Sequence, residues 1–160
     1  MPPFLVSRSG LRAAISLRQC LQIASRAVQT LARKTCISVP EAPSTGPYSP
    51  AVVTQGLVFT SGQLGLLPDG TLVEGGVVRE IEQTLKNLEA VLKATGVEMG
   101  NVVKCTVFLK NMSDFNVVNE IYARAFPREP PARSCFQVGS LPRGASVEIE
   151  AVAVYGKISS

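Results

Sequence analysis

The sequence predicts a single α+β domain in which a β-sheet packs on two helices. Two segments, 76–96 and 113–126, repeat apolar residues at helical steps, and several shorter runs are rich in β-branched residues. A chain of 160 residues can bury enough apolar surface to fold without disulfides or metals. One hydrophobic core is therefore expected.

The first 36 residues differ from the rest in charge. Residues 1–40 contain no acidic residue and six basic ones: Arg8, Arg12, Arg18, Arg26, Arg33 and Lys34. Apolar residues recur three or four apart in the same segment, at Leu11, Ala14, Leu17, Leu21, Ala24, Val28 and Leu31. An Arg-rich, acid-free amphipathic helix is typical of a transit peptide. The competing interpretation, an ordinary surface helix, is disfavoured because such helices normally carry acidic residues as well.

We therefore predict that residues 1–36 are a transit peptide and that residues 37–160 form the domain. The expected destination is the mitochondrial matrix, with the plastid as the alternative, since both kinds of transit peptide share this composition. A membrane span is not expected, because basic residues interrupt every apolar run well short of the ~20 residues that a bilayer crossing needs.

The domain opens irregularly and then forms a strand, a helix and a second strand. Leu57–Thr60 is predicted to be a short strand, and Pro68-Asp69-Gly70 a turn. Between Gly76 and Gly96, apolar residues at steps of three and four predict an amphipathic helix closed by Gly96. The β-branched run Val102–Leu109 predicts the next strand, and this order suggests a βαβ-type crossover.

A second helix and two final strands complete the domain. Ser113 or Asp114 can cap the helix, whose buried side carries Phe115, Val118, Ile121, Tyr122 and Phe126. Pro127 and Pro130 end it. The final strands are expected at Ala132–Val138 and Val147–Tyr155, and the second of them alternates between two unlike faces.

Composition excludes several classes of chemistry. The sequence has no histidine, so Ser-His and Cys-His nucleophiles and the commonest metal ligand are absent. Cys105 and Cys135 have neither metal-ligand spacing nor a CxxC motif, and no metal or cofactor is expected. Outside residues 1–40 there are ten basic and twelve acidic residues, so the domain carries −2 and no nucleic-acid-binding face is predicted.

A few polar residues are candidates for chemistry. Arg133 begins a strand, where its planar guanidinium could bind a carboxylate through two parallel hydrogen bonds, although an edge-strand charge is the commoner role. Glu148 and Glu150 lie two apart on one strand face, either solvated or, in a cleft, able to hold or deprotonate a water. Tyr48 follows the rigid Gly46-Pro47 pair, and most such tyrosines simply pack. Ser61-Gly62-Gln63 offers a hydroxyl and a bare backbone amide.

Together these positions resemble the RidA (reactive intermediate deaminase) family over residues 37–156. The resemblance rests on Gly46-Pro47-Tyr48-Ser49, Thr60-Ser61-Gly62-Gln63, Asn101-Val102-Val103-Lys104, Asp114-Phe115, Val118-Asn119-Glu120-Ile121-Tyr122, Pro131-Ala132-Arg133-Ser134, Leu141-Pro142 and Val147-Glu148-Ile149-Glu150-Ala151. One departure is Pro50, where many members have Gln. The resemblance implies a chorismate-mutase-like α+β fold with a mixed sheet on two helices, and a homotrimer with sites at the clefts between subunits.

The same resemblance implies the reaction. Members hydrolyse 2-imino acids such as 2-iminobutanoate and 2-iminopropanoate, which pyridoxal-phosphate-dependent dehydratases release, to 2-oxo acids and ammonia without a cofactor. Arg133 would grip the substrate carboxylate, while Glu148 and the backbone of Cys135 position the attacking water. Tyr48 is assigned with these two side chains to catalysis. The residues assigned to the substrate pocket are Ser61, Gly62, Asn119, Cys135 and Phe115.

Two other functions compete with this one. An RNA-directed ribonuclease or translation inhibitor is disfavoured, since the domain is mildly acidic and shows no stripe of aromatic and basic residues. A non-catalytic binder of small carboxylates would use the same arginine, so the sequence leaves it open.

Overall fold

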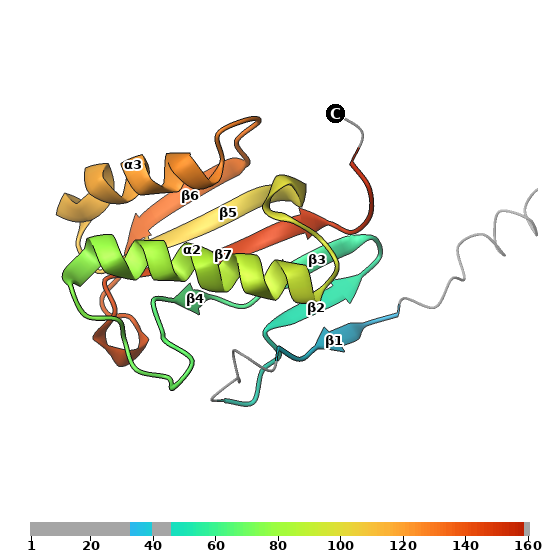
Figure 1. Cartoon of the computed structure of the whole chain (residues 1–160), viewed down its shortest axis with the longest axis horizontal. Helices are drawn as coiled ribbons and strands as arrows, with labels where there is room; N and C mark the ends of the chain where they lie inside the picture. The colour runs from blue at the N-terminus through green and yellow to red at the C-terminus, as the bar shows by residue number, and fades with distance from the viewer. Residues whose placement is uncertain (1–32, 40–45, 159–160) are drawn as a thin grey trace, which may run out of the picture. The chain divides into compact units, whose positions relative to one another are not determined.

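The computed structural model describes residues 33–39 and 46–158, and within them one sheet carries two helices (Figure 1). Its strands are β1 (Thr35–Ile37), β2 (Ala51–Thr54), β3 (Leu57–Thr60), β4 (Gln63–Leu64), β5 (Val102–Leu109), β6 (Ala132–Gln137) and β7 (Val147–Val154). The helices are α2 (Gly76–Ala94) and α3 (Phe115–Ala125), with single 3-10 turns at η1 (Met99–Asn101), η2 (Met112–Asp114) and η3 (Pro142–Gly144).

The strands are ordered β1-β2-β3-β7-β5-β6, and the short β4 also pairs with β7. β5 and β6 are parallel and every other pairing is antiparallel, so the sheet is mixed as expected. Because β7 is antiparallel to both β3 and β5, those two strands run the same way. The chain thus makes the expected crossover from β3 through α2 to β5, and β7 lies between these two strands. A second crossover leads from β5 through α3 to the neighbouring β6.

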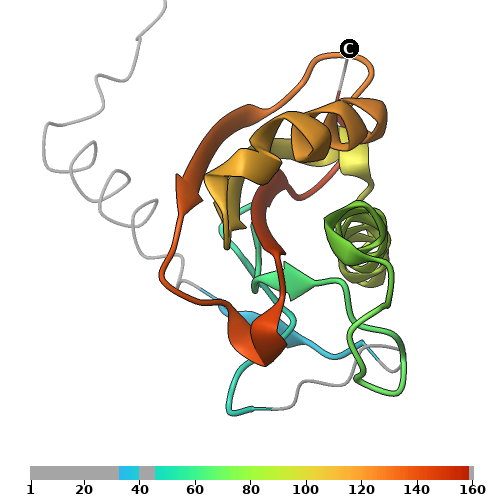
Figure 2. The same ribbon diagram turned by 90° about the vertical axis from the view of Figure 1, so that its left-hand side faces the viewer.

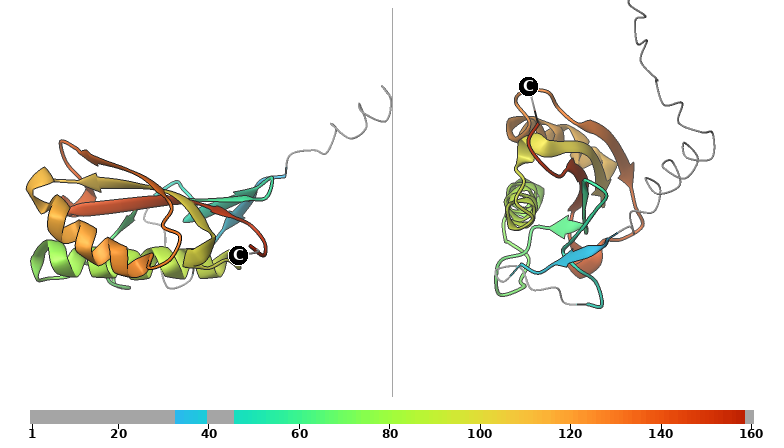
Figure 3. Two further views of the ribbon diagram at one scale, coloured as in Figure 1. Left: turned by 90° about the horizontal axis from the view of Figure 1, so that it is seen from above. Right: turned by 90° about the vertical axis from the view of Figure 1, so that its right-hand side faces the viewer.

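Both helices lie on one face of the sheet, and no described helix covers the other (Figures 2 and 3). The alternation along β7 explains this arrangement: Val147, Ile149, Ala151 and Ala153 are buried beneath the helices, whereas Glu148 and Glu150 point to the opposite, open face. Cys105, Val107 and Leu109 of β5 join the same core. α2 contributes Ile81, Leu88, Val91 and Leu92, all fully buried.

The helix predictions hold in outline. α2 ends at Ala94 with Thr95 as its C-cap, and the next residue, Gly96, takes a left-handed φ of 85° as a closing glycine should. The predicted cap of the second helix is wrong in detail. Asp114 stands at the N-cap of α3 but makes no side-chain cap bond, and Asn111 instead accepts a hydrogen bond from the amide of Ser113 one turn earlier, in η2.

The N-terminal prediction lies mostly outside the described residues. The described part begins at Arg33, and β1 starts at Thr35, two residues before the expected boundary at Ile37. Among the described helices none is long and apolar enough to cross a membrane.

Candidate active site

Arg133 is the second residue of β6, at the edge of the sheet. It pairs in register with Cys105 of β5, so its side chain points to the helix-covered face. Its Nη2 donates a hydrogen bond of 2.8 Å to Oδ1 of Asn119 on α3. Its Cζ lies 4.7 Å from the centre of the Tyr122 ring and 5.7 Å from that of Phe115. One face of α3 therefore holds the guanidinium.

No carboxylate neutralises this guanidinium among residues 33–39 and 46–158, where the salt bridges are Arg79–Glu82 and Lys93–Glu89. A guanidinium carries five N–H donors, and one of them serves Asn119. The remaining donors and the positive charge suit an incoming carboxylate.

The backbone of β6 adds an amide beside Arg133. The amide of Val138 donates to the carbonyl of Leu109 on β5 at 2.9 Å. Because strand amides alternate in direction, the amide of Cys135, three residues earlier, points away from β5 at the free edge of the sheet. The thiol of Cys135 is half-buried, and burial raises its pKa while the charge of Arg133 opposes that rise.

Glu148 lies on the other face of the sheet. It pairs with Phe108 of β5 and with Leu64 of β4, and it is half-buried. Burial raises the pKa of its carboxyl group, and the negative charge of Glu150 raises it further. A carboxylate with a raised pKa is a better proton acceptor than a free one.

Gly62 and Ser61 lie next to Glu148. A Cβ on Gly62 would collide with the Glu148 carboxylate, meeting its Cδ at 2.7 Å and its Cγ at 3.0 Å, so any larger residue there would displace this carboxylate. The hydroxyl of Ser61 donates to the carbonyl of Ser49 at 2.7 Å, and its amide to that of Pro50 at 2.9 Å. These bonds attach the loop that carries Tyr48 to the end of β3, and Pro50 takes part through its carbonyl alone.

Tyr48 itself is 53% exposed, and its ring packs over the Cα of Gly46. Within residues 33–39 and 46–158, its hydroxyl makes no hydrogen bond to another candidate residue.

The start of β7 is fixed by a buried carboxylate that the sequence analysis did not single out. Glu80 on α2 is 5% exposed and accepts hydrogen bonds from the amide and hydroxyl of Ser146, at 2.6 and 2.9 Å. Gly65 packs against the backbone of Glu80, where a Cβ would approach within 2.8 Å. Glu80 thus anchors the segment that leads into Glu148.

The candidate residues therefore form two groups on opposite faces of one subunit. Arg133, Asn119, Phe115 and the Cys135 amide make up the first, and Glu148, Gly62 and Ser61, with the Tyr48 loop, make up the second. Tyr122 was expected only as a core residue, although its spacing from Phe115 and Asn119 places it on the same helix face as these two residues.

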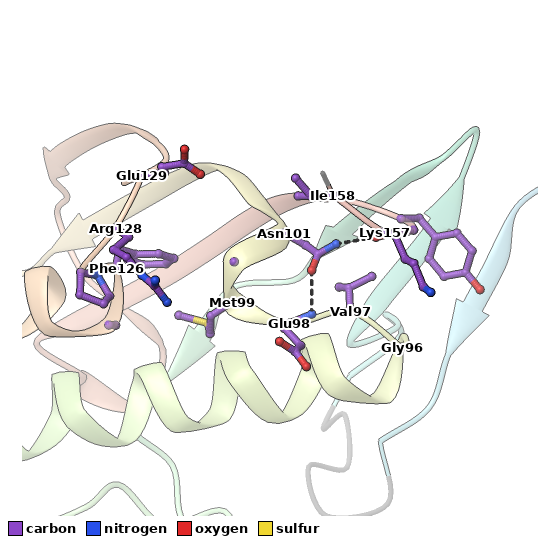
Figure 4. A pocket seen from close by; sticks show the side chains of 15 residues that line it. Gly96, Val97, Glu98, Met99, Asn101, Phe126, Arg128, Glu129, Lys157 and Ile158 are labelled. Carbon is purple, nitrogen blue, oxygen red and sulfur yellow. Dashed lines mark hydrogen bonds between the residues drawn. The ribbon is translucent and has the colours of Figure 1, made fainter. Parts of the chain in front are cut away.

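A depression of about 1220 Å³ lies elsewhere, between the ends of α2 and α3 and the C-terminal residues (Figure 4). None of the candidate residues lines it. Asn101 there donates to the carbonyls of Val154 and Gly156 at 3.0 and 2.8 Å, which ties the C-terminal strand to η1. Nowhere in the described ranges do three His, Cys, Asp or Glu side chains gather as a metal site would require.

Several known proteins are similar to this chain. The family model described as endoribonuclease L-PSP matches residues 39–155. A mouse protein named 2-iminobutanoate/2-iminopropanoate deaminase is 54% identical over 75% of this chain and 90% of its own. An Arabidopsis thaliana protein named Reactive Intermediate Deaminase A, chloroplastic, is 47% identical over 76% of this chain and 66% of its own. The crystal structure of E. coli TdcF with bound serine has a TM-score of 0.72, with 36% identity over 76% of this chain and 99% of that one.

Proposed function

Because the chain belongs to the endoribonuclease L-PSP family, which includes the RidA deaminases, we propose that it hydrolyses 2-imino acids to 2-oxo acids and ammonia. Its expected substrates are 2-iminobutanoate and 2-iminopropanoate, after which several relatives are named. The observation that carries the proposal is the guanidinium of Arg133, which α3 holds in place and no described carboxylate neutralises.

Arg133 binds the substrate carboxylate. Its free N–H groups form a fork that matches two carboxylate oxygens, and the outward amide of Cys135 offers a further donor for the substrate or the attacking water. The E. coli relative solved with bound serine supports a site for a small molecule with a carboxylate.

Glu148 handles the water and its protons. The water attacks the imine carbon and forms a C–O bond, while the C=N electron pair moves to nitrogen. For a protonated imine, Glu148 accepts the proton that the water loses and returns it to the nitrogen. The C–N bond then breaks and its electron pair leaves with ammonia, while the hydroxyl group on the same carbon gives its proton to Glu148 and becomes the carbonyl. The raised pKa of Glu148 suits both steps, and Gly62 leaves room for its carboxyl group.

We further propose that the active site is shared within a homotrimer. Arg133 and Glu148 lie on opposite faces of one sheet, so a single subunit cannot direct both at one small substrate. If Arg133 of one subunit faces Glu148 of its neighbour, both groups reach the same substrate, and a closed ring also covers the open sheet face with exposed Phe59 and Phe136. An equilibrium sedimentation run that found a fully active monomer would rule this out.

RNA cleavage or inhibition of translation remains the less favoured function, since the domain carries a net negative charge and the chain has no histidine. A non-catalytic carboxylate binder would share the Arg133 geometry, and turnover distinguishes it from an enzyme.

Mitochondrial targeting by the Arg-rich N-terminal segment completes the proposal. β1 supports cleavage before Thr35, because removal of Thr35–Ile37 would leave β2 paired on one side only, with β3. Mass spectrometry of the organellar protein tests this, and a mature chain that begins at Met1 would contradict it.

The activity is tested by adding the full chain to a threonine dehydratase reaction and following the decay of 2-iminobutanoate. Wild-type protein should speed the decay, and Arg133→Ala should not. Acceleration by neither protein would show that the chain is not this deaminase, and equal acceleration by both would remove Arg133 from the mechanism.

A further inference from the structure

Arg133 is held by three side chains from successive turns of α3. Phe115, Asn119 and Tyr122 are spaced four and three residues apart, so they share one face of the helix. Asn119 holds one end of the guanidinium through its 2.8 Å hydrogen bond, and the guanidinium carbon lies over both rings. The Tyr122 ring is the nearer of the two, at 4.7 Å compared with 5.7 Å.

The Tyr122 ring cannot move easily. Tyr122 is 5% exposed, and its ring packs against that of Phe126, with ring centres 4.8 Å apart at an interplanar angle of 40°. Phe126 is itself buried, at 7% exposure. The guanidinium therefore lies over a ring that the core holds fixed.

The hydroxyl group of Tyr122 does not explain this placement. It is buried and has no hydrogen-bond partner among the described residues. Burial and the nearby Cys105 thiol raise its pKa, so the side chain stays neutral and offers Arg133 no negative charge. What it offers is the electron-rich face of its ring, which attracts a cation.

We propose that Tyr122 is a positioning residue for substrate binding, whose ring face orients the Arg133 guanidinium so that its free N–H groups meet the substrate carboxylate. The inference rests on the proposed function, because it assigns Tyr122 a part in the same carboxylate site. It predicts that affinity depends on the electron density of the ring and not on the hydroxyl.

The test uses the full chain and 2-oxobutanoate, the reaction product, as the probe in titration calorimetry. Tyr122→Phe keeps the ring and should bind within about twofold of wild type. Tyr122→Leu removes the ring and should weaken binding about threefold to thirtyfold, the range of a partly buried cation–π contact. Because Leu also disturbs the core, phenylalanines with one, two and three ring fluorines should replace Tyr122 as well. They keep the shape of the ring while withdrawing charge from its face.

Affinity should fall stepwise with each fluorine, and KM for 2-iminobutanoate should rise in parallel while kcat changes less than about twofold. The same fluorinated series at Tyr155, which is 51% exposed and lines the depression that contains none of the candidate residues, should leave both constants unchanged.

If affinity and KM stay constant along the Tyr122 series in an enzyme that still hydrolyses imines, the inference is wrong and the proposed function stands. If the wild-type chain neither binds 2-oxobutanoate nor hydrolyses 2-iminobutanoate, the proposed function falls and this inference falls with it.

Discussion

Gly62→Ala should remove most of the activity without unfolding the protein. The added Cβ would lie 2.7 Å from Cδ of Glu148, whereas ordinary contacts begin near 3.4 Å. Oε1 of the same carboxyl group lies nearer still, so the group must retreat by more than about 0.7 Å or turn away. A displacement of about 1 Å of a reacting group costs on the order of 10²-fold in rate, so kcat should fall about 100-fold. Gly62 has no positive φ, so the substitution adds no backbone strain.

The assay is imine decay in the coupled dehydratase reaction, with thermal unfolding measured alongside. Gly100→Ala is the matched control, because its Cβ meets nothing within 4 Å. In a Glu148→Gln protein, Gly62→Ala should lower kcat little further, because both substitutions act on the carboxyl group of Glu148. Wild-type turnover by a folded Gly62→Ala protein would refute the assignment of Glu148 to the reacting water.

Three further predictions follow from the site. Arg133→Lys should bind 2-oxobutanoate more weakly in calorimetry, because the point charge of lysine cannot replace the two-pronged guanidinium. Glu148→Gln should keep that affinity and lose about 10²–10⁴-fold in turnover. Normal kinetics in either variant would contradict the role assigned to that residue. Glu150→Gln removes a charge that raises the pKa of Glu148, so the acidic limb of the pH–rate profile should move to lower pH, and an unmoved limb would exclude this coupling. Glu80→Ala strips two hydrogen bonds from Ser146 and should cost about 1–3 kcal/mol in urea unfolding. Glu82→Ala, which loses only the surface ion pair with Arg79, is the control, and an equal loss in both variants would show that the buried bonds add no stability.

The sequence predicted the two helices and the strands 57–60, 102–109, 132–138 and 147–155 because each has a strong periodic or β-branched pattern. The last two strands of the structure end one residue earlier, at Gln137 and Val154. The sequence patterns missed β1, β2 and β4, which are only two to four residues long. Such strands carry too few residues to show an alternation, and they form because longer neighbours pair with them.

The family resemblance indicated which residues belong to the site, and the structure shows which of them lie close together and on which face of the sheet. The close approach of Gly62 to Glu148 depends on the pairing of β4 with β7, which joins segments more than 80 residues apart. The separation of Arg133 from Glu148 depends on the register of β6 and β7 against β5. A pattern of neighbouring residues in the sequence predicts neither of these pairings. The position of Tyr122 beside Arg133, in contrast, follows from helical spacing once Phe115 and Asn119 are assigned to the site.

The position of β7 has a consequence for how the protein is made. This last strand of the chain lies in the middle of the sheet, between β3 and β5, so the earlier strands have no shared partner until the ribosome has released the C-terminal residues. A nascent or truncated chain that ends before Val147 lacks both the central strand and Glu148. The sheet is therefore completed only after β7 has been synthesised, and because β7 joins segments distant in sequence, its pairing is expected to be a late step of folding.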